Sequence, residues 1–149
     1  MAIKKPLPPP SVGRHLVFAA AIGKAVCSRL LEPHGLSLAQ WAVLSSIWRN
    51  GPLSIKLLAE MTGNAPPATS RIVDRMIEGG LLIRNADPDD RRAVVIGPTE
   101  RGEELRPLQA IYQEVNAVLL AGFSPQEQAE LTRLLTKIET NGRNWMGKD

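Results

Sequence analysis

The sequence predicts a mainly α-helical fold with one small β-hairpin. Apolar residues recur at helical spacing over most of the chain, and Ser or Thr residues mark several helix starts. The helical spacing of apolar residues stops between residues 81 and 98, where two short runs rich in β-forming residues occur instead. A chain of 149 residues with 44% hydrophobic residues has the size and apolar content of one compact domain.

The chain opens with a proline-rich segment and a long helix. Residues 1–11 include the run KKPLPPP, which is typical of a flexible or polyproline-like arm. Apolar residues such as Leu16 and Ala20 then follow at helical spacing, which predicts a helix over residues 12–31 that ends near Pro33. A second helix begins after Ser37, because Ser37 and Gln40 form a capping-box pattern.

Two short helices with a tight turn between them come next. The second helix ends at Asn50, and Ser54 restarts a helix over residues 55–61 that Gly63 stops. Pro66 and Pro67 suit the first turn of the following helix, which runs to Gly79. This arrangement fits a helix-turn-helix.

The β-prone runs are residues 81–84 and 93–96, and the turn-forming stretch NADPDDRR lies between them. We therefore expect a hairpin with a charged tip. Thr99 caps a long helix over residues 100–120, and Ser124 with Glu127 opens the last helix. The last helix is expected to fray near residue 141 and to bury Leu131, Leu134, Leu135 and Ile138.

Composition excludes several classes of protein. No run of about 18 apolar residues is present, and the N-terminus lacks the apolar region of a secretory leader. The single cysteine, Cys27, favours a reducing cytoplasm. The chain has no glycine-rich phosphate loop, nucleophile elbow or paired His/carboxylate motif, so we expect neither an enzyme nor a cofactor. A pI of about 9.4 and a net charge of +3 are weak evidence for a nucleic-acid partner.

The order of these motifs resembles the MarR family of bacterial transcriptional regulators. The residues that carry the resemblance are GLS at 35–37 with QW at 40–41, LLA at 57–59, TSRIVDRM at 69–76 with GGL at 79–81, and DPDDRR at 87–92 followed by Thr99 and Gly102. The resemblance covers about residues 12–140. Pro98 departs from the family, which usually has Leu there, and we expect the second strand to end early because proline lacks a backbone donor.

The resemblance implies a winged helix-turn-helix over residues 36–99 and a helical dimerisation region built from residues 12–34 and 100–144. It further implies a cytoplasmic homodimer that binds double-stranded DNA at a pseudo-palindromic operator, with repression as the usual mode. A dimer would place its two recognition helices roughly 34–36 Å apart, about one turn of DNA.

A recognition helix reads bases from its N-terminal half. The candidate DNA contacts on this helix are Pro66, Pro67, Thr69, Ser70 and Arg71. Arg71 can bind a guanine edge bidentately, or it can form an ion pair with Asp74 or Glu78 on the same helix. Ser54 can cap its helix and can also donate to a phosphate, with capping as the favoured role.

The hairpin tip carries three aspartates and two arginines. The resemblance implies that Asp90 holds Arg92, which enters the minor groove, while Arg91 contacts a phosphate. A narrow minor groove concentrates negative potential and so attracts arginine. The alternative is a surface turn with no DNA contact.

Family members often bind small phenolic or other aromatic effectors, and a small aromatic effector is therefore a further expected partner. The candidate lining residues are Arg14, His15, Phe18, His34, Trp41 and Trp48. The alternative is that Trp41 or Trp48 belongs to the core.

Three other functions stay open: a redox sensor, an architectural DNA binder and a winged helix that contacts another protein. Cys27 can act as a thiol redox sensor, although a buried and inert cysteine is favoured. His15, Cys27 and His34 lack the spacing of metal ligands, so no metal is expected. The chain can also be an architectural DNA binder without sequence preference, or a winged helix that contacts another protein.

Overall fold

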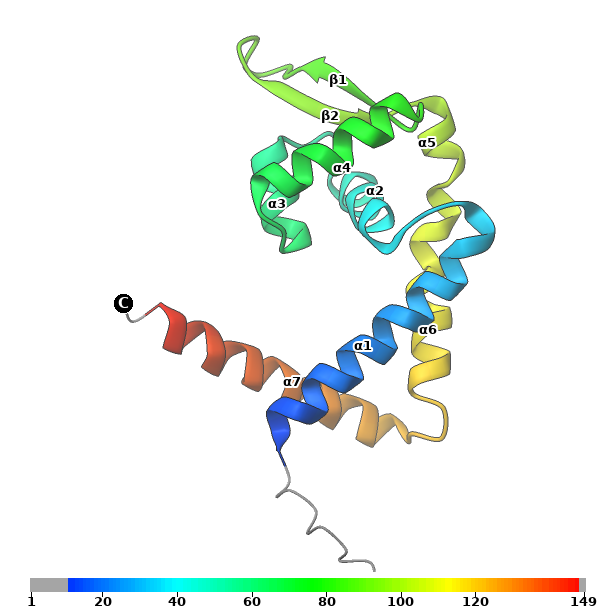
Figure 1. Ribbon diagram of the computed structural model, residues 1–149, viewed down its shortest axis with the longest axis vertical. Coiled ribbons are helices and arrows are strands. Elements are labelled where there is room, and N and C mark those ends of the chain that lie inside the picture. The colour runs from blue at the N-terminus through cyan, green and yellow to red at the C-terminus, as the bar shows by residue number, and fades with distance from the viewer. Residues whose placement is uncertain (1–10, 148–149) are drawn as a thin grey trace, which may run out of the picture. The chain divides into compact units, whose positions relative to one another are not determined.

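The computed structural model describes residues 11–147, so the arm predicted at residues 1–11 lies outside the described residues except for Ser11. The fold is mostly helical with one antiparallel hairpin, as predicted (Figure 1). The elements are α1 Val12–Leu31, η1 Glu32–His34, α2 Leu38–Asn50, α3 Ile55–Thr62, α4 Pro66–Glu78, β1 Leu82–Ala86, β2 Val94–Pro98, α5 Glu100–Glu104, η2 Arg106–Ala110, α6 Ile111–Leu119 and α7 Pro125–Met146.

The chain divides after Val115 into two compact units. This division cuts across the helical region expected from residues 12–34 and 100–144, because α1 belongs to the first unit and α7 to the second.

The helix starts predicted from Ser residues are confirmed. The Ser37 N–H donates to Gln40 Oε1 at 3.0 Å, and the Gln40 N–H donates to Ser37 Oγ at 3.2 Å, which completes the capping box of α2. Ser54 Oγ accepts from the Leu57 N–H at 3.2 Å at the start of α3. These bonds satisfy donors that would otherwise lack a partner in the first helical turn.

Helix α2 forms the centre of the first unit. It packs against α1, α3, α4, η2 and β2. The Trp48 indole N–H donates to the Gly102 carbonyl at 3.2 Å, and the Trp41 indole N–H donates to the Leu108 carbonyl at 2.8 Å. The core around α2 contains Leu31, Leu36, Val43, Leu44, Ile47, Leu58, Val73, Met76, Leu82, Ile96 and Ile111. Both tryptophans therefore join α2 to the chain that follows the hairpin.

The hairpin pairs Leu82 with Pro98 at its base and Ala86 with Val94 near its tip. Leu53 forms an isolated β-bridge with the outer side of β2, because its N–H donates to the Ile96 carbonyl at 3.0 Å and its carbonyl accepts from the Ile96 N–H at 2.8 Å. The wing is thus hydrogen-bonded to the segment that links α2 and α3.

The expectation that Pro98 ends the second strand early is wrong, because β2 includes Pro98. Backbone groups of alternate residues in a strand point to the same side. Since the N–H of Ile96 faces Leu53, the nitrogen of Pro98 also faces away from β1. The missing donor therefore costs no hydrogen bond between the two strands.

The two ends of the hairpin meet at a set of hydrogen bonds that we call the hairpin base, comprising residues 79–81 and 99–102. The Thr99 N–H donates to the Leu81 carbonyl at 3.0 Å, and the Thr99 hydroxyl donates to the Gly80 carbonyl at 2.6 Å. The same hydroxyl oxygen accepts from the Gly102 N–H at 3.1 Å and so caps α5. One threonine therefore both closes the hairpin and starts the next helix.

The single helix predicted over residues 100–120 is wrong. The chain instead forms α5, η2 and α6 in succession. Pro107 lies within η2, and proline has no N–H to donate to the carbonyl four residues earlier, that of Glu103. The chain tightens into a 3-10 turn at this point, and the Arg106 guanidinium group donates to the Trp48 carbonyl at 2.9 Å.

Helix α7 begins with the predicted capping box, in which the Ser124 N–H donates to Glu127 at 2.8 Å. The helix continues past residue 141 to Met146, so the predicted fraying is wrong. None of its residues is buried, and Leu134, Leu135 and Ile138 are 38–43% exposed. The expected burial of these residues is therefore wrong, because no described element of this unit covers the apolar stripe of α7.

We predict that Gly102→Ala destabilises the fold by about 1–3 kcal/mol, because overpacking a tight site forces the backbone to move. A Cβ at Gly102 would lie 2.2 Å from the Leu81 carbonyl oxygen. The measurement is urea unfolding. Gly142→Ala is the control, since nothing lies within 4 Å of a Cβ at Gly142 and helical alanine is favourable. Equal unfolding midpoints for Gly102→Ala and the unaltered protein would show that the hairpin base tolerates a side chain.

Candidate DNA-binding interface

Helix α4 has one buried face and one exposed face. Thr69, Val73 and Met76 are buried against the core. Pro66 and Pro67 in the first turn and Arg71 in the next turn are exposed, and Ser70 is partly exposed. The N-terminal half of α4 therefore offers a surface of the kind that enters a major groove.

Thr69 does not belong to that surface, so the contact with DNA expected of Thr69 is wrong. The residue is completely buried, and its hydroxyl donates to the Ala65 carbonyl at 3.2 Å. The helix repeat turns Thr69 to the same side as Val73 and Met76. The threonine therefore satisfies its hydroxyl within its own helix.

Arg71 forms none of the ion pairs found among residues 11–147. The carboxylate of Asp74, one of its expected alternative partners, instead pairs with Arg84 of β1. Both side chains of that pair are about half exposed, at 46% and 49%. The pair joins α4 to the hairpin, and Arg71 is not part of it.

Arg84 contacts α4 through Asp74, although no sequence motif marks Arg84 as a site residue. Arg84 lies on β1, whose residues after Leu82 are exposed. The alternation of side chains along a strand would have placed it on one face of the hairpin. Its partner on α4 could not be inferred, because helix–strand contacts depend on packing rather than on local spacing.

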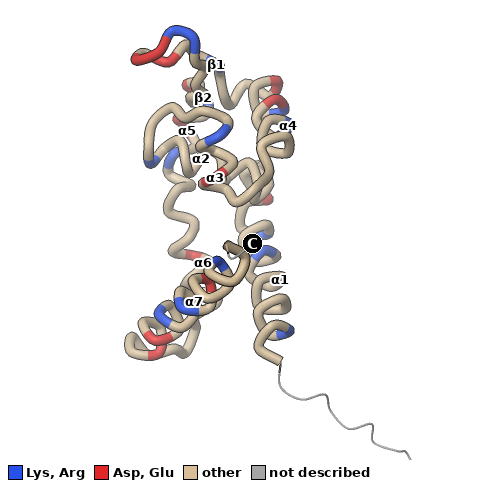
Figure 2. The backbone as a smooth tube through the Cα atoms, turned by 90° about the vertical axis from the view of Figure 1, so that its left-hand side faces the viewer, with Lys and Arg blue, Asp and Glu red and all other residues tan. Residues whose placement is uncertain are grey.

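The hairpin tip is held together by its aspartates. The Asp89 N–H donates to Asp87 Oδ1 at 2.9 Å, and the Arg92 N–H donates to Asp90 Oδ1 at 3.0 Å. Acidic and basic residues lie together at this tip (Figure 2). Two of the three carboxylates thus serve the turn itself, which offsets part of their repulsion toward a phosphate backbone.

Arg91 and Arg92 are exposed, and neither forms an ion pair among the described residues. Asp90 was expected to hold the guanidinium group of Arg92, but its carboxylate instead accepts a hydrogen bond from the Arg92 backbone N–H. The carboxylate therefore fixes the turn from which the arginine side chain projects.

Ser54 caps α3 as favoured, with its hydroxyl oxygen accepting from Leu57. Its side chain is partly exposed.

The six candidate effector-binding residues do not form one cavity. Trp48 is buried at 5% exposure, and Trp41 is partly buried, with both indole N–H groups bonded to backbone carbonyls. The Arg14 guanidinium lies 5.3 Å from the centre of the Phe18 ring on the exposed side of α1. His15 and His34 are exposed. The tryptophans therefore have a structural role, which was the alternative.

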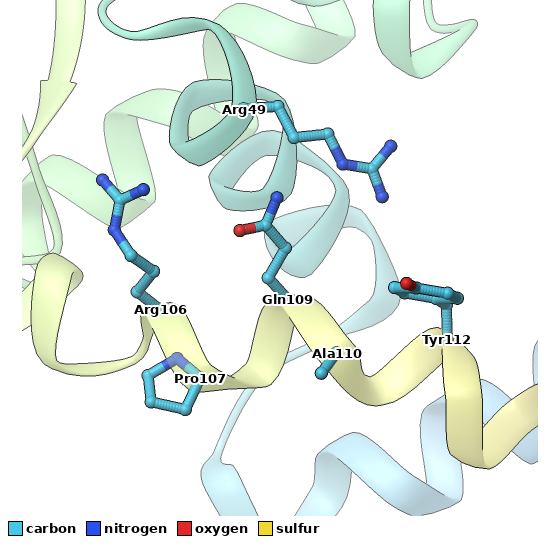
Figure 3. Close-up of a pocket in the computed structure, with 6 residues that line it drawn as sticks. All are labelled: Arg49, Arg106, Pro107, Gln109, Ala110 and Tyr112. Carbon is cyan, nitrogen blue, oxygen red and sulfur yellow. The ribbon is translucent and has the colours of Figure 1, made fainter.

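Two cavities of the first unit are lined by other residues. One of about 450 Å³ is lined by Arg49, Arg106, Pro107, Gln109, Ala110 and Tyr112 (Figure 3). The other, of about 980 Å³, is lined by Ala25, Ser28, Arg29, Glu32, Gly35, Leu36, Ser37, Leu38 and Gln40.

Within residues 11–147, no three His, Cys, Asp or Glu side chains gather as a metal ion would require. Cys27 is partly exposed and forms no disulfide. Along the described helices, none combines the length and apolar character that crossing a membrane requires.

Comparisons with known proteins agree with this geometry. The MarR family matches residues 36–94, from the start of α2 to the beginning of β2. A probable transcriptional regulator from Pseudomonas aeruginosa is 30% identical with a TM-score of 0.76, and the match covers 86% of this chain and 96% of that chain. A cysteine-to-serine variant of MarR from E. coli, complexed with operator DNA, is 25% identical with a TM-score of 0.78, covering 85% and 92% of the two chains.

Bordetella bronchiseptica BpsR, whose DNA binding is regulated by 6-hydroxynicotinic acid, is 24% identical with a TM-score of 0.79, and the match covers 90% of this chain and 97% of BpsR. The family match over residues 36–94 covers the helices α2 to α4 and the first strand of the hairpin that follows them. The chain belongs to the MarR family of winged helix transcriptional regulators.

Proposed function

We propose that this protein is a homodimeric, sequence-specific DNA-binding repressor that acts in the cytoplasm on a pseudo-palindromic operator. The observation that carries the proposal is the link between α4 and the wing. Asp74 of α4 pairs with Arg84 of β1. This ion pair links α4, which carries Arg71, to the hairpin, whose tip carries Arg91 and Arg92. The E. coli MarR variant that this chain resembles is complexed with operator DNA.

In this proposal, Pro66, Pro67, Ser70 and Arg71 face the major groove. Arg71 reads a guanine edge, because a guanidinium group matches the two acceptors of that base. Arg92 enters the minor groove, and Arg91 binds a phosphate. Ser54 stays a secondary phosphate contact at the N-terminus of α3.

Exposed apolar residues support the homodimer. In the first unit, four of them lie on α1, where Val12, Val17, Phe18 and Ile22 are 57–69% exposed. In the second unit, several lie on α7, where Trp145 and Met146 are 77% and 64% exposed in addition to the stripe described above. Apolar patches of this kind mark association surfaces, and a second copy of the chain is the partner proposed here.

A small aromatic effector is proposed to release the DNA. The similarity to BpsR supports this part of the proposal, since 6-hydroxynicotinic acid regulates the DNA binding of that protein. Trp41 and Trp48 are not part of the effector site proposed here, because both indole N–H groups already donate to backbone carbonyls.

Selection of bound sequences from a random DNA pool tests sequence specificity. We expect enrichment of two inverted half-sites about 10–10.5 base pairs apart, since a two-fold dimer presents its recognition helices at that spacing. No enriched sequence, together with a steep salt dependence of binding, would instead identify an architectural DNA binder.

We predict that Arg92→Ala lowers the affinity for the selected DNA by about five- to 150-fold, because an arginine contact with DNA contributes roughly 1–3 kcal/mol. Fluorescence anisotropy with labelled DNA measures this. Arg133→Ala is the matched control, as it removes the same charge from α7, where Arg133 pairs with Glu130. Equal losses for the two variants would mean that only net charge matters, and unchanged binding by Arg92→Ala would remove the wing from the mechanism.

We predict that the protein sediments at micromolar concentration with twice the 16.2 kDa mass of one chain. Ile138→Glu should shift the equilibrium toward the monomer, because it places a charge on the apolar stripe of α7. Glu139→Gln, on the same helix, is the control. A monomer in the unaltered protein would contradict the homodimer.

A further inference from the structure

Asp74 is an acidic residue on the helix that is proposed to read DNA. Arg71 lies three residues before it and Arg75 one residue after it, and both arginines are exposed. Neither arginine forms an ion pair among residues 11–147. Affinity for DNA rises with the number of phosphates that a protein neutralises, so a carboxylate among these cations weakens the attraction. Attraction to DNA therefore does not account for an aspartate at this position.

The carboxylate of Asp74 contacts the hairpin instead. It accepts from the guanidinium group of Arg84, and within residues 11–147 this is the only side-chain hydrogen bond between α4 and the two strands. Side chains two residues apart in a strand lie on the same face, so Arg84 shares its face of β1 with Leu82, which is buried in the core. Helix α4 runs beside the hairpin and packs against β1 (Figure 1).

The outer part of β1 has little other support. Burial on β1 stops at Leu82, at the base, and every later residue of the strand is exposed. Leu53 bonds to Ile96 of β2 and not to β1. Arg84 and Ile96 form the central pair of the register, between the base and the tip. The Asp74–Arg84 pair is therefore the polar contact that orients the middle of β1 relative to α4.

The pair is suited to fixing geometry rather than to stabilising the fold. Both of its side chains are about half exposed, and ion pairs in contact with water contribute little to stability. A hydrogen bond between a guanidinium group and a carboxylate is nevertheless directional, so it restricts where the two groups lie. The geometry that it restricts is the separation between Arg71 on α4 and Arg92 at the hairpin tip.

We propose that Asp74 determines DNA specificity as a positioning residue, without contacting DNA itself. By holding Arg84, it sets the separation between Arg71 and Arg92, so that both arginines reach their grooves on the same DNA site. Without the pair, the two arginines still attract phosphates, but their separation is no longer fixed. This inference rests on the proposed function, and it assigns a role to two residues that the proposed DNA contacts do not include.

Fluorescence anisotropy at one salt concentration tests the inference, with the selected DNA and a scrambled duplex of equal length and composition. The variant is Asp74→Asn. Its matched control is Glu78→Gln, because Glu78 is an exposed carboxylate on the same helix and forms no ion pair among the described residues. Each substitution removes one negative charge, so attraction alone predicts tighter binding of both duplexes by both variants.

We expect a different result for Asp74→Asn. It should bind the selected DNA at least about fivefold more weakly than the unaltered protein does, because the two arginine contacts lose their fixed separation. Its affinity for the scrambled duplex should equal that of Glu78→Gln, and Glu78→Gln should keep the full preference for the selected DNA. Asp74→Asn that binds both duplexes as Glu78→Gln does would overturn the proposal.

Arg84→Gln and the double variant test whether the two residues act as a unit. Arg84→Gln should also lower the preference for the selected DNA, since it removes the same contact. Adding Asp74→Asn to Arg84→Gln should lower that preference no further, because residues that act through one shared contact are not additive. Losses that multiply in the double variant would overturn a role through the pair.

Hydrogen exchange without DNA tests the positioning by itself. The hairpin amides of Asp74→Asn and of Arg84→Gln should exchange at least about threefold faster than those of the unaltered protein, because a less restrained hairpin opens more often. Glu78→Gln should exchange as the unaltered protein does. Unchanged exchange in Asp74→Asn and Arg84→Gln would overturn the positioning role. Equal binding of both duplexes by the unaltered protein would instead refute the proposed function, and faster exchange would still assign the positioning of the hairpin to the pair.

Discussion

The arrangement of the proposed DNA-binding surface depends on the hydrogen bonds of Thr99 at the hairpin base. Its N–H and hydroxyl bind two successive carbonyls in the turn that leaves α4, and its hydroxyl oxygen accepts from Gly102. The Gly102 carbonyl in turn accepts from the buried Trp48 indole. This chain of contacts fixes the exit of α4, both ends of the hairpin and α2 relative to one another. Only glycine allows the Leu81 carbonyl to approach so closely.

With its base fixed, the wing can act as part of the recognition surface rather than as a loose loop. The ion pair between Asp74 and Arg84 adds a second link, and Leu53 adds a third through Ile96. A half-exposed pair of this kind contributes little to stability, so its value lies in geometry. The carboxylates of the tip have a related role, since they order the turn that displays Arg92. Rigid placement of a few cations lowers the entropic cost of binding DNA.

Local features of the fold could be predicted from sequence, and features that depend on distant neighbours could not. Capping boxes at Ser37 and Ser124 were confirmed because cap and partner are three residues apart. Pro107 interrupts the helix predicted over residues 100–120, because proline has no backbone N–H to donate. Pro98 is accommodated in β2, because its nitrogen faces away from β1 and no hydrogen bond between the strands is lost. Thr69 turned inward, as the helix repeat would have indicated, and the Asp74–Arg84 pair required knowledge of packing.

Hydroxyl-radical footprinting on the selected DNA tests the central claim most directly, because the radical attacks sugars from the minor groove. A dimer with a wing on each outer side should protect two minor-groove segments placed symmetrically beyond the half-sites. These two segments are where Arg92 is expected to enter. Protection spread evenly along the DNA, or confined to the centre of the site, would contradict an operator read jointly by α4 and the wing.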